Sequence, residues 1–219
     1  MTEEAKKESW SIKARKAVDD IIENIKKLPF ITKMMDGTLS LDHFGKYIGQ
    51  DIFYCIEYSK SLKILSEKLK SFSEENHKTF EKFSDSCLKC ANSLKEDYCL
   101  KFNLKEEKEK SKVCEQYCNF ERENAVNGTI EEGLAGCLAC FWVYDEIGRY
   151  MYANQTKGEN IYKVWMDDYS GGPSKSLAAY LKICNEMAEK SVEVEEKMIK
   201  TYRQAVQFEY YFWEDACKI

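Results

Sequence analysis

Two acidic residues stand where the hydrophobic pattern of the chain predicts apolar side chains. Asp51 interrupts one helical stripe, and Glu209 interrupts another near the end of the chain. The stripes consist of Phe44, Tyr47, Tyr54 and Tyr58 in the first case, and of Met198, Tyr202, Ala205, Phe212 and Ala216 in the second. A buried carboxyl resists ionisation, with a pKa raised by up to about 3 to 5 units. Such a group either completes a structural hydrogen bond or ion pair, or acts as a general acid or base. Because few Lys or Arg residues share these stripes, we expect both carboxyls in one functional site.

Cys140 is a third residue that can do chemistry. It lies in LACFWVYDEIGRY, on a helical stripe with Gly136, Val143, Tyr144 and Ile147. Cysteine is among the most buried residue types, so spacing alone favours a core side chain. A nucleophilic role would require a thiolate, formed with the help of a neighbouring base, cation or helix N-terminus. Both interpretations of Cys140 stay open at this point.

The cysteine pairs CLKC and CLAC raise the alternative of a metal centre. Zinc sites built from CxxC units usually lie in turns, whereas both pairs fall in segments with helical periodicity. The chain has only His43 and His77, and neither supplies the ExxH motif of a carboxylate-bridged di-iron bundle. We therefore expect no metal and no cofactor.

Helices must position these residues, because hydrophobic periodicity of 3.6 residues recurs along the chain and no strand pattern competes. Ser40 and Ser73 are typical N-caps, and Thr129 with Glu132 fits a capping box. The charge run Lys105–Lys112 is typical of a solvated loop or a frayed helix end. The expected elements are a helix over 4–28, a helical turn over 29–37, and further helices over 40–72, 74–103, 113–127, 129–158, 161–168, 174–190 and 192–217. Seven or eight such helices with short connections predict an all-α bundle.

Composition limits the class of protein. A chain of 219 residues can form one domain, which we place over 1–219. The net charge is −5, with Lys and Glu interleaved, so a clustered basic surface for nucleic acid is not expected. The N-terminal MTEEAKKESW lacks the apolar core of a signal peptide, and no stretch is apolar enough to span a membrane. We expect a soluble, cytoplasmic protein whose ten cysteines are reduced.

An ordered set of short motifs runs along nearly the whole chain. The motifs are LPF and DGTL within 28–39, QDIFY at 50–54, CFWVYDEIG at 140–148, YKVWMDDY at 162–169 and FEYYFWEDA at 208–216. Together these motifs resemble those of the TenA/THI-4 family. The resemblance implies a haem-oxygenase-like helical fold without haem. It also implies a thiamin salvage hydrolase, which converts 4-amino-5-aminomethyl-2-methylpyrimidine, or thiamin, to the hydroxymethylpyrimidine. Because Cys140 is present, the chain is similar to the cysteine-containing branch of the family.

The same resemblance implies roles for individual residues. Cys140 would be the nucleophile, Glu209 the proton donor and acceptor, and Asp51 the partner of the aminopyrimidine edge. The tyrosines expected to bind the substrate are Tyr54, Tyr117, Tyr144 and Tyr169. Family members usually form tetramers or dimers, so we expect a homo-oligomer. Two alternatives remain: a metal-dependent oxidase or oxygenase on the same fold, and a non-catalytic protein that binds an aminopyrimidine.

Overall fold

Serine caps start the helix that carries Asp51 and the neighbouring helix that packs against it. The computed structural model describes residues 8–168 and 170–218. Helix α4 (Leu41–Leu69) begins after Ser40, whose hydroxyl accepts a hydrogen bond from a first-turn backbone N–H. Helix α5 (Glu74–Ser93) begins after Ser73 in the same way. Both predicted N-caps are confirmed, because capping depends on residues within one turn of each other.

The helix that carries Cys140 also starts as the sequence predicts. Thr129 and Glu132 form a reciprocal capping box at the start of α7 (Ile130–Asn154). This helix ends at Asn154, four residues before the predicted end near Gly158. Helix α6 (Lys112–Val126) precedes it. These two helices place Tyr117 and Cys140 in neighbouring walls of the bundle, because α6 and α7 pack together.

The first predicted helix, over 4–28, is wrong as one element. The described part of this stretch forms two short helices, α1 (Trp10–Lys16) and α2 (Asp19–Ile25). Residues 4–7 lie outside the described residues. The break falls at Val18, whose backbone has φ −120° and ψ 7°. Its side chain remains fully buried, so the apolar stripe continues across the break and periodicity could not reveal it.

The remaining helices close the bundle. Helix α3 (Pro29–Asp36) ends at Gly37, which has φ +78°, a conformation that favours glycine. Helices α8 (Lys163–Asp167), α9 (Lys175–Ala188) and α10 (Val192–Asp215) follow. The described chain therefore holds ten α-helices rather than seven or eight, and no strand.

The predicted helix over 74–103 changes its winding partway. After α5, Leu94–Leu100 form a π-helical segment, a local widening often found at functional sites. The charge run that follows is a loop up to Ser111, as predicted, but it is tied to α4. The side-chain amide of Gln50 donates to the Glu109 carbonyl, and its oxygen accepts from the Ser111 N–H.

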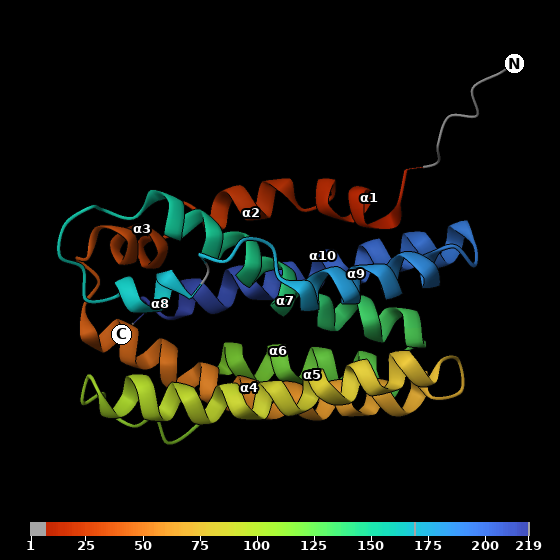
Figure 1. Cartoon of the computed structure of the whole chain (residues 1–219), viewed down its shortest axis with the longest axis horizontal. Helices are drawn as coiled ribbons and strands as arrows, with labels where there is room; N and C mark the ends of the chain where they lie inside the picture. The colour runs from red at the N-terminus through yellow and green to blue at the C-terminus, as the bar shows by residue number, and fades with distance from the viewer. Residues whose placement is uncertain (1–7, 169, 219) are drawn as a thin grey trace, which may run out of the picture.

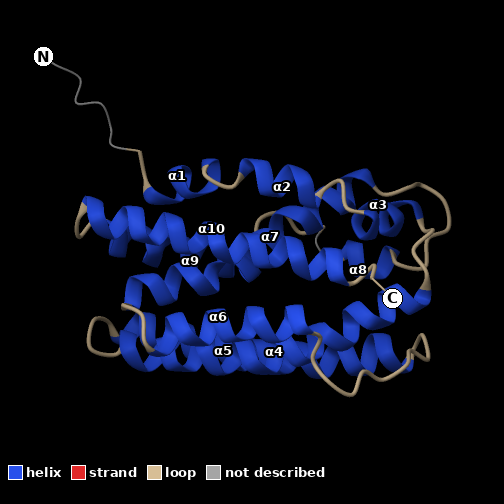
Figure 2. Ribbon diagram, turned by 180° about the vertical axis from the view of Figure 1, so that it is seen from behind, coloured by secondary structure: helices blue, strands red, loops and turns tan. Residues whose placement is uncertain are grey.

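The helices lie roughly along one direction in stacked groups (Figure 1). Helices α4, α5 and α6 form one side, α1 and α2 form the opposite side, and α7, α9 and α10 lie between them (Figures 1 and 2). The most extensive contacts join α4 to α5 and α7 to α10. Asp51 lies on α4, Cys140 on α7 and Glu209 on α10. The buried apolar residues of these helices belong to one hydrophobic core cluster.

Candidate active site

A cleft of about 720 Å³ opens beside the predicted site. Its walls come from α4, α5, the π-helical segment, α7, α8 and residues 168 and 171–175. Three of the sequence-predicted site residues line it, namely Asp51, Cys140 and Tyr144. Tyr54, Tyr117 and Glu209 are not among the described lining residues, and all three are nearly inaccessible to solvent. The predicted residues thus form two layers, one at the cleft surface and one behind it. Tyr169 lies outside the described residues.

Asp51 forms part of the cleft wall, although only 8% of its surface is exposed. The Cys55 thiol, one turn along α4, donates a long contact of 4.0 Å to its Oδ1. Burial raises the pKa of Asp51 to about 7, although a hydrogen bond from the Tyr47 hydroxyl acts in the opposite direction. Near neutral pH this carboxyl can therefore either accept or donate a proton.

Glu209 lies deeper, with 1% of its surface exposed. The Tyr117 hydroxyl donates to its Oε1 at 2.7 Å, across the contact between α6 and α10. Burial raises the pKa of Glu209 to about 8; the Tyr117 bond lowers it, and the charge of Asp51 raises it. At neutral pH Glu209 is consequently a protonated acid that can supply a proton.

Cys140 joins the two layers, because it lines the cleft while its thiol is shielded from bulk water. Burial raises the pKa of Cys140 well above its ordinary value, and the charge of Glu209 adds to this. The Tyr54 hydroxyl beside the sulfur favours the thiolate and acts in the opposite direction. The resting residue is therefore a thiol, so nucleophilic attack requires a group that removes its proton.

Aromatic rings pack this region tightly. Tyr54 stacks on Tyr58 and on Tyr117, with ring centroids 5.3 Å and 5.0 Å apart. Tyr117 in turn stacks on Phe208 at 5.4 Å. At the cleft surface, the hydroxyls of Tyr47 and Tyr144 are hydrogen-bonded to each other at 3.1 Å. These stacks fix the hydroxyl groups of the tyrosines relative to the carboxyls, because aromatic side chains have few rotatable bonds.

Asp145 stabilises the rim of the cleft, a role that the sequence analysis did not predict. Asp145 accepts a hydrogen bond from the Ser174 backbone N–H at 2.8 Å and pairs with Arg149 at 2.8 Å. These contacts tie the glycine-containing segment before α9 to α7. Part of the cleft wall is therefore an anchored segment, since Gly171, Gly172 and Ser174 line the cleft.

Sequence reasoning missed one carboxyl of the inner layer. Glu121 is fully buried, and its Oε1 accepts a hydrogen bond from the Tyr54 hydroxyl at 2.7 Å. The signal was present in α6, where an acid shares the inward face with four other buried residues. That face consists of Cys114, Tyr117, Cys118, Glu121 and Ala125.

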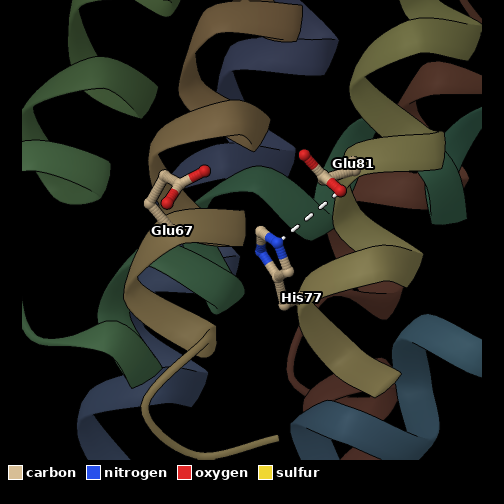
Figure 3. A group of neighbouring side chains, drawn as sticks. All are labelled: Glu67, His77 and Glu81. Atoms are coloured by element: carbon tan, nitrogen blue, oxygen red, sulfur yellow. Dashed lines mark ion pairs between the residues drawn. The ribbon is translucent and has the colours of Figure 1, made fainter. Parts of the chain in front are cut away.

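A separate group of side chains has the ligand types of a metal site (Figure 3). The group consists of Glu67 near the end of α4 and of His77 and Glu81 in the first turns of α5. None of the three lines the cleft. The Lys63 ammonium contacts both carboxylates, closely at Glu81 and at 3.8 Å from Glu67. The chain thus already supplies a cation to this group. Among the described residues, no cysteine belongs to such a group.

The helical arrangement and the two-layered cleft define a haem-oxygenase-like fold. A domain with that fold from Shewanella denitrificans OS217 superposes with a TM-score of 0.70 at 12% identity, covering 97% of this chain and 94% of the other. A TenA homologue from Pyrococcus furiosus superposes with a TM-score of 0.83 at 19% identity, covering 94% of this chain and 99% of the other. The predicted fold class is confirmed.

The chain belongs to the TENA/THI-4/PQQC family, whose model matches residues 15–218. It is 25% identical over 191 residues to the aminopyrimidine aminohydrolase of Bacillus subtilis strain 168, covering 84% of this chain and 80% of that protein. It is 34% identical over 155 residues to the thiamine biosynthesis multifunctional protein ThiED of Corynebacterium glutamicum. That match covers 71% of this chain but only 20% of ThiED. No helix within the described residues is long and apolar enough to cross a membrane.

Proposed function

We propose that this protein is an aminopyrimidine aminohydrolase of the thiaminase II type, with Cys140 as its nucleophile. It would hydrolyse 4-amino-5-aminomethyl-2-methylpyrimidine, and also thiamin, to 4-amino-5-hydroxymethyl-2-methylpyrimidine. One observation carries the proposal: Cys140 and Asp51 line the same cleft, the charge of the deeper Glu209 acts on the Cys140 thiol, and burial raises the pKa values of the two carboxyls to about 7 and about 8. The family membership and the named relatives support the substrate class.

The chemistry explains why a cysteine stands at the cleft surface. Addition of the sulfur to the pyrimidine ring interrupts aromaticity and lets electrons expel the leaving group from the exocyclic methylene. Ammonia leaves from the aminomethyl substrate, and the thiazole leaves from thiamin. Water then adds to the methylene carbon, and the sulfur departs to restore the ring and Cys140.

The two carboxyls divide the proton and binding tasks. Glu209 is protonated at neutral pH, so it can give a proton to the ring when the sulfur adds and recover it when the ring is restored. Asp51 lines the cleft, so its carboxylate can accept hydrogen bonds from the amino group and fix the orientation of the ring. The charge of Asp51 raises the pKa of Glu209, which favours the protonated form of Glu209.

Tyrosines complete the binding surface. Tyr144 lines the cleft and presents its ring and hydroxyl to a flat heterocycle. Tyr54 and Tyr117 support this surface from behind through their stacked rings. We include Tyr169 in the proposed binding residues on the family motif alone.

The test is release of hydroxymethylpyrimidine from each of the two substrates by the purified protein. We expect turnover of at least one of them, and full activity in Cys90→Ser, because Cys90 lines the same cleft without a role in the reaction. Turnover of neither substrate would refute the proposed function. Binding of an aminopyrimidine without turnover, unchanged by Cys140→Ser, would instead support a binding protein.

We further propose one domain over 1–219, a cytoplasmic location and a homo-oligomer, either dimer or tetramer. Several large apolar side chains that are more than half exposed would be covered in an assembly. They are Phe72, Leu100, Ile161, Val164 and Val192. Sedimentation at micromolar concentration should give a mass of at least two chains, and a mass of one chain would contradict the assembly.

A further inference from the structure

The helix face that carries Cys140 also carries Asp145. The residues of α7 that line the cleft are Cys140, Phe141, Tyr144 and Asp145, and this spacing puts all four on one face of the helix. The rise from Cys140 to Asp145 is about 7.5 Å along the helix axis. A ring bonded to the Cys140 sulfur therefore lies within about two helical turns of the Asp145 carboxylate.

Both carboxylate oxygens of Asp145 are engaged, although only 6% of the residue is exposed. Arg149, one turn further along α7, donates from Nε and Nη2 to Oδ2 at 2.9 Å and 2.8 Å. Oδ1 accepts the Ser174 backbone N–H at 2.8 Å. The guanidinium thus balances the charge and fixes the plane of the carboxylate, while Oδ1 holds Ser174.

The chain between α8 and α9 forms a wall of the cleft that has little packing of its own. We call residues 170–174 the wall segment, and Gly171, Gly172, Pro173 and Ser174 line the cleft from it. A Cβ added to Gly171 or Gly172 would meet no atom of the described residues within 4 Å, apart from its chain neighbours. Gly172 has φ +77°, a conformation that favours glycine. Side-chain packing at the two glycines therefore does not hold the wall segment in place.

Hydrogen bonds to other helices hold the chain at both ends of the wall segment. At its C-terminal end, the Ser174 N–H reaches Asp145 of α7. Before its N-terminal end, Asp168 accepts a hydrogen bond from the Tyr98 hydroxyl of the π-helical segment at 3.3 Å. The bond to Asp145 is shorter, and its acceptor is buried whereas Asp168 is exposed. Asp145 therefore provides the stronger tether.

We propose that Asp145 is a positioning residue for substrate binding, which fixes the wall segment against the helix that carries Cys140. This proposal rests on the proposed function. With the tether in place, the wall segment and the cleft face of α7 enclose the pyrimidine ring. Without the tether, the wall segment moves away from α7, and the ring loses contacts on that side. Asp145 takes no part in making or breaking bonds, so its loss weakens binding and leaves the chemical step nearly unchanged.

A pair of substitutions at Ser174 separates the tether from the helix cap at the same residue. Ser174→Ala removes the hydroxyl that caps α9 but keeps the backbone N–H. Ser174→Pro removes both groups, and the native φ of −65° is one that proline adopts. We expect KM to be at least about tenfold higher in Ser174→Pro than in Ser174→Ala, with kcat values within about threefold of each other. Equal KM values in the two variants would overturn the proposal.

Asp145→Ala removes the acceptor of the same hydrogen bond and should raise KM by a similar factor. The double variant with Ser174→Pro should be little worse than either single variant, because both substitutions remove one bond. Increases in KM that multiply in the double variant would contradict a shared tether. Thermal unfolding identifies variants that misfold, and the Ser174 pair decides the question if Asp145→Ala does not fold.

Hydrogen exchange without substrate distinguishes failure of this proposal from failure of the proposed function. The Ser174 amide should exchange at least about ten times faster in Asp145→Ala than in the wild type, because its acceptor is lost. An unchanged rate would refute the tether, even in a protein that hydrolyses its substrates.

Calorimetry of hydroxymethylpyrimidine binding completes the test and needs no turnover. The dissociation constant should rise in Asp145→Ala by about the same factor as KM, at least about tenfold. Faster exchange of the Ser174 amide with unchanged pyrimidine binding would show that the tether serves stability alone, and would overturn the positioning role.

Discussion

Replacement of Glu209 by Gln should stabilise the folded protein at alkaline pH and leave its stability nearly unchanged at acid pH. The amide keeps the shape of the side chain and an oxygen that can accept the Tyr117 hydrogen bond of 2.7 Å. It removes only the ionisation of a carboxyl with 1% of its surface exposed. The variant therefore isolates the cost of burying that charge.

The size of the effect follows from the pKa of Glu209. The folded value of about 8 lies above the ordinary value of 4.5. Between these two pH values the folded state holds a proton that the unfolded state releases, so wild-type stability falls as pH rises. The difference of about 3.5 pH units, at about 1.4 kcal/mol per unit, gives an upper bound of roughly 5 kcal/mol above pH 8.

The difference in unfolding free energy between the two proteins can be measured by urea unfolding. The pH values of about 4.5, 6, 7.5 and 9 span the ordinary and the raised pKa of Glu209. Carboxyls that do not interact with Glu209 affect both proteins alike, so the difference in unfolding free energy reports Glu209 together with its interaction with Asp51. We expect a difference near zero at the lowest pH that grows to at least about 2 kcal/mol at the highest. A difference that stays constant across the series would refute the burial argument for Glu209.

Three further predictions concern the site and its supporting helix. Tyr117→Phe removes the bond that lowers the pKa of Glu209, so the alkaline limb of kcat should move upward by about one to two pH units; a limb that moves downward would contradict the role of this bond. Asp51→Asn should raise KM for the aminopyrimidine at pH 8 by about ten- to a hundredfold with a smaller effect on kcat, because a carboxylate acceptor is lost. Equal KM values in steady-state assays would exclude Asp51 from binding. Thr129→Ala breaks the capping box with Glu132 and should lower the free energy of unfolding by about 1 kcal/mol. Calorimetry should show a Tm lower by about 2–4 °C, and kcat should stay unchanged. An unaltered Tm would show that the cap adds no stability.

Local signals in the sequence were sufficient for helix starts. Ser40, Ser73 and Thr129 cap their helices as predicted, since a cap involves only the residues of the first turn. The break at Val18 was not predictable in this way. Val18 is apolar and buried, as it would be within one continuous helix. Helices α1 and α2 both pack against α10, but α1 also contacts α9 whereas α2 contacts α7, and such long-range contacts leave no local signal in the sequence.

The candidate site was partly predictable for a similar reason. Asp51 and Glu209 each interrupt an apolar stripe, so a single helix reveals that they point inward. Their partners come from other helices, and no local pattern pairs Tyr117 with Glu209 or Tyr54 with Glu121. Nor does the sequence distinguish cleft from interior. Cys140 and Glu209 both lie on apolar faces, yet only Cys140 lines the cleft.

The measurement that tests the central claim most directly is the single-turnover rate of pyrimidine release by Cys140→Ser, compared with the wild type and with Cys90→Ser. An excess of enzyme over the preferred substrate confines the measurement to one turnover. If Cys140 forms the covalent bond, its replacement should slow release by at least about a thousandfold, while Cys90→Ser retains the wild-type rate. Release by Cys140→Ser within a few-fold of the wild type would contradict a cysteine nucleophile in this cleft.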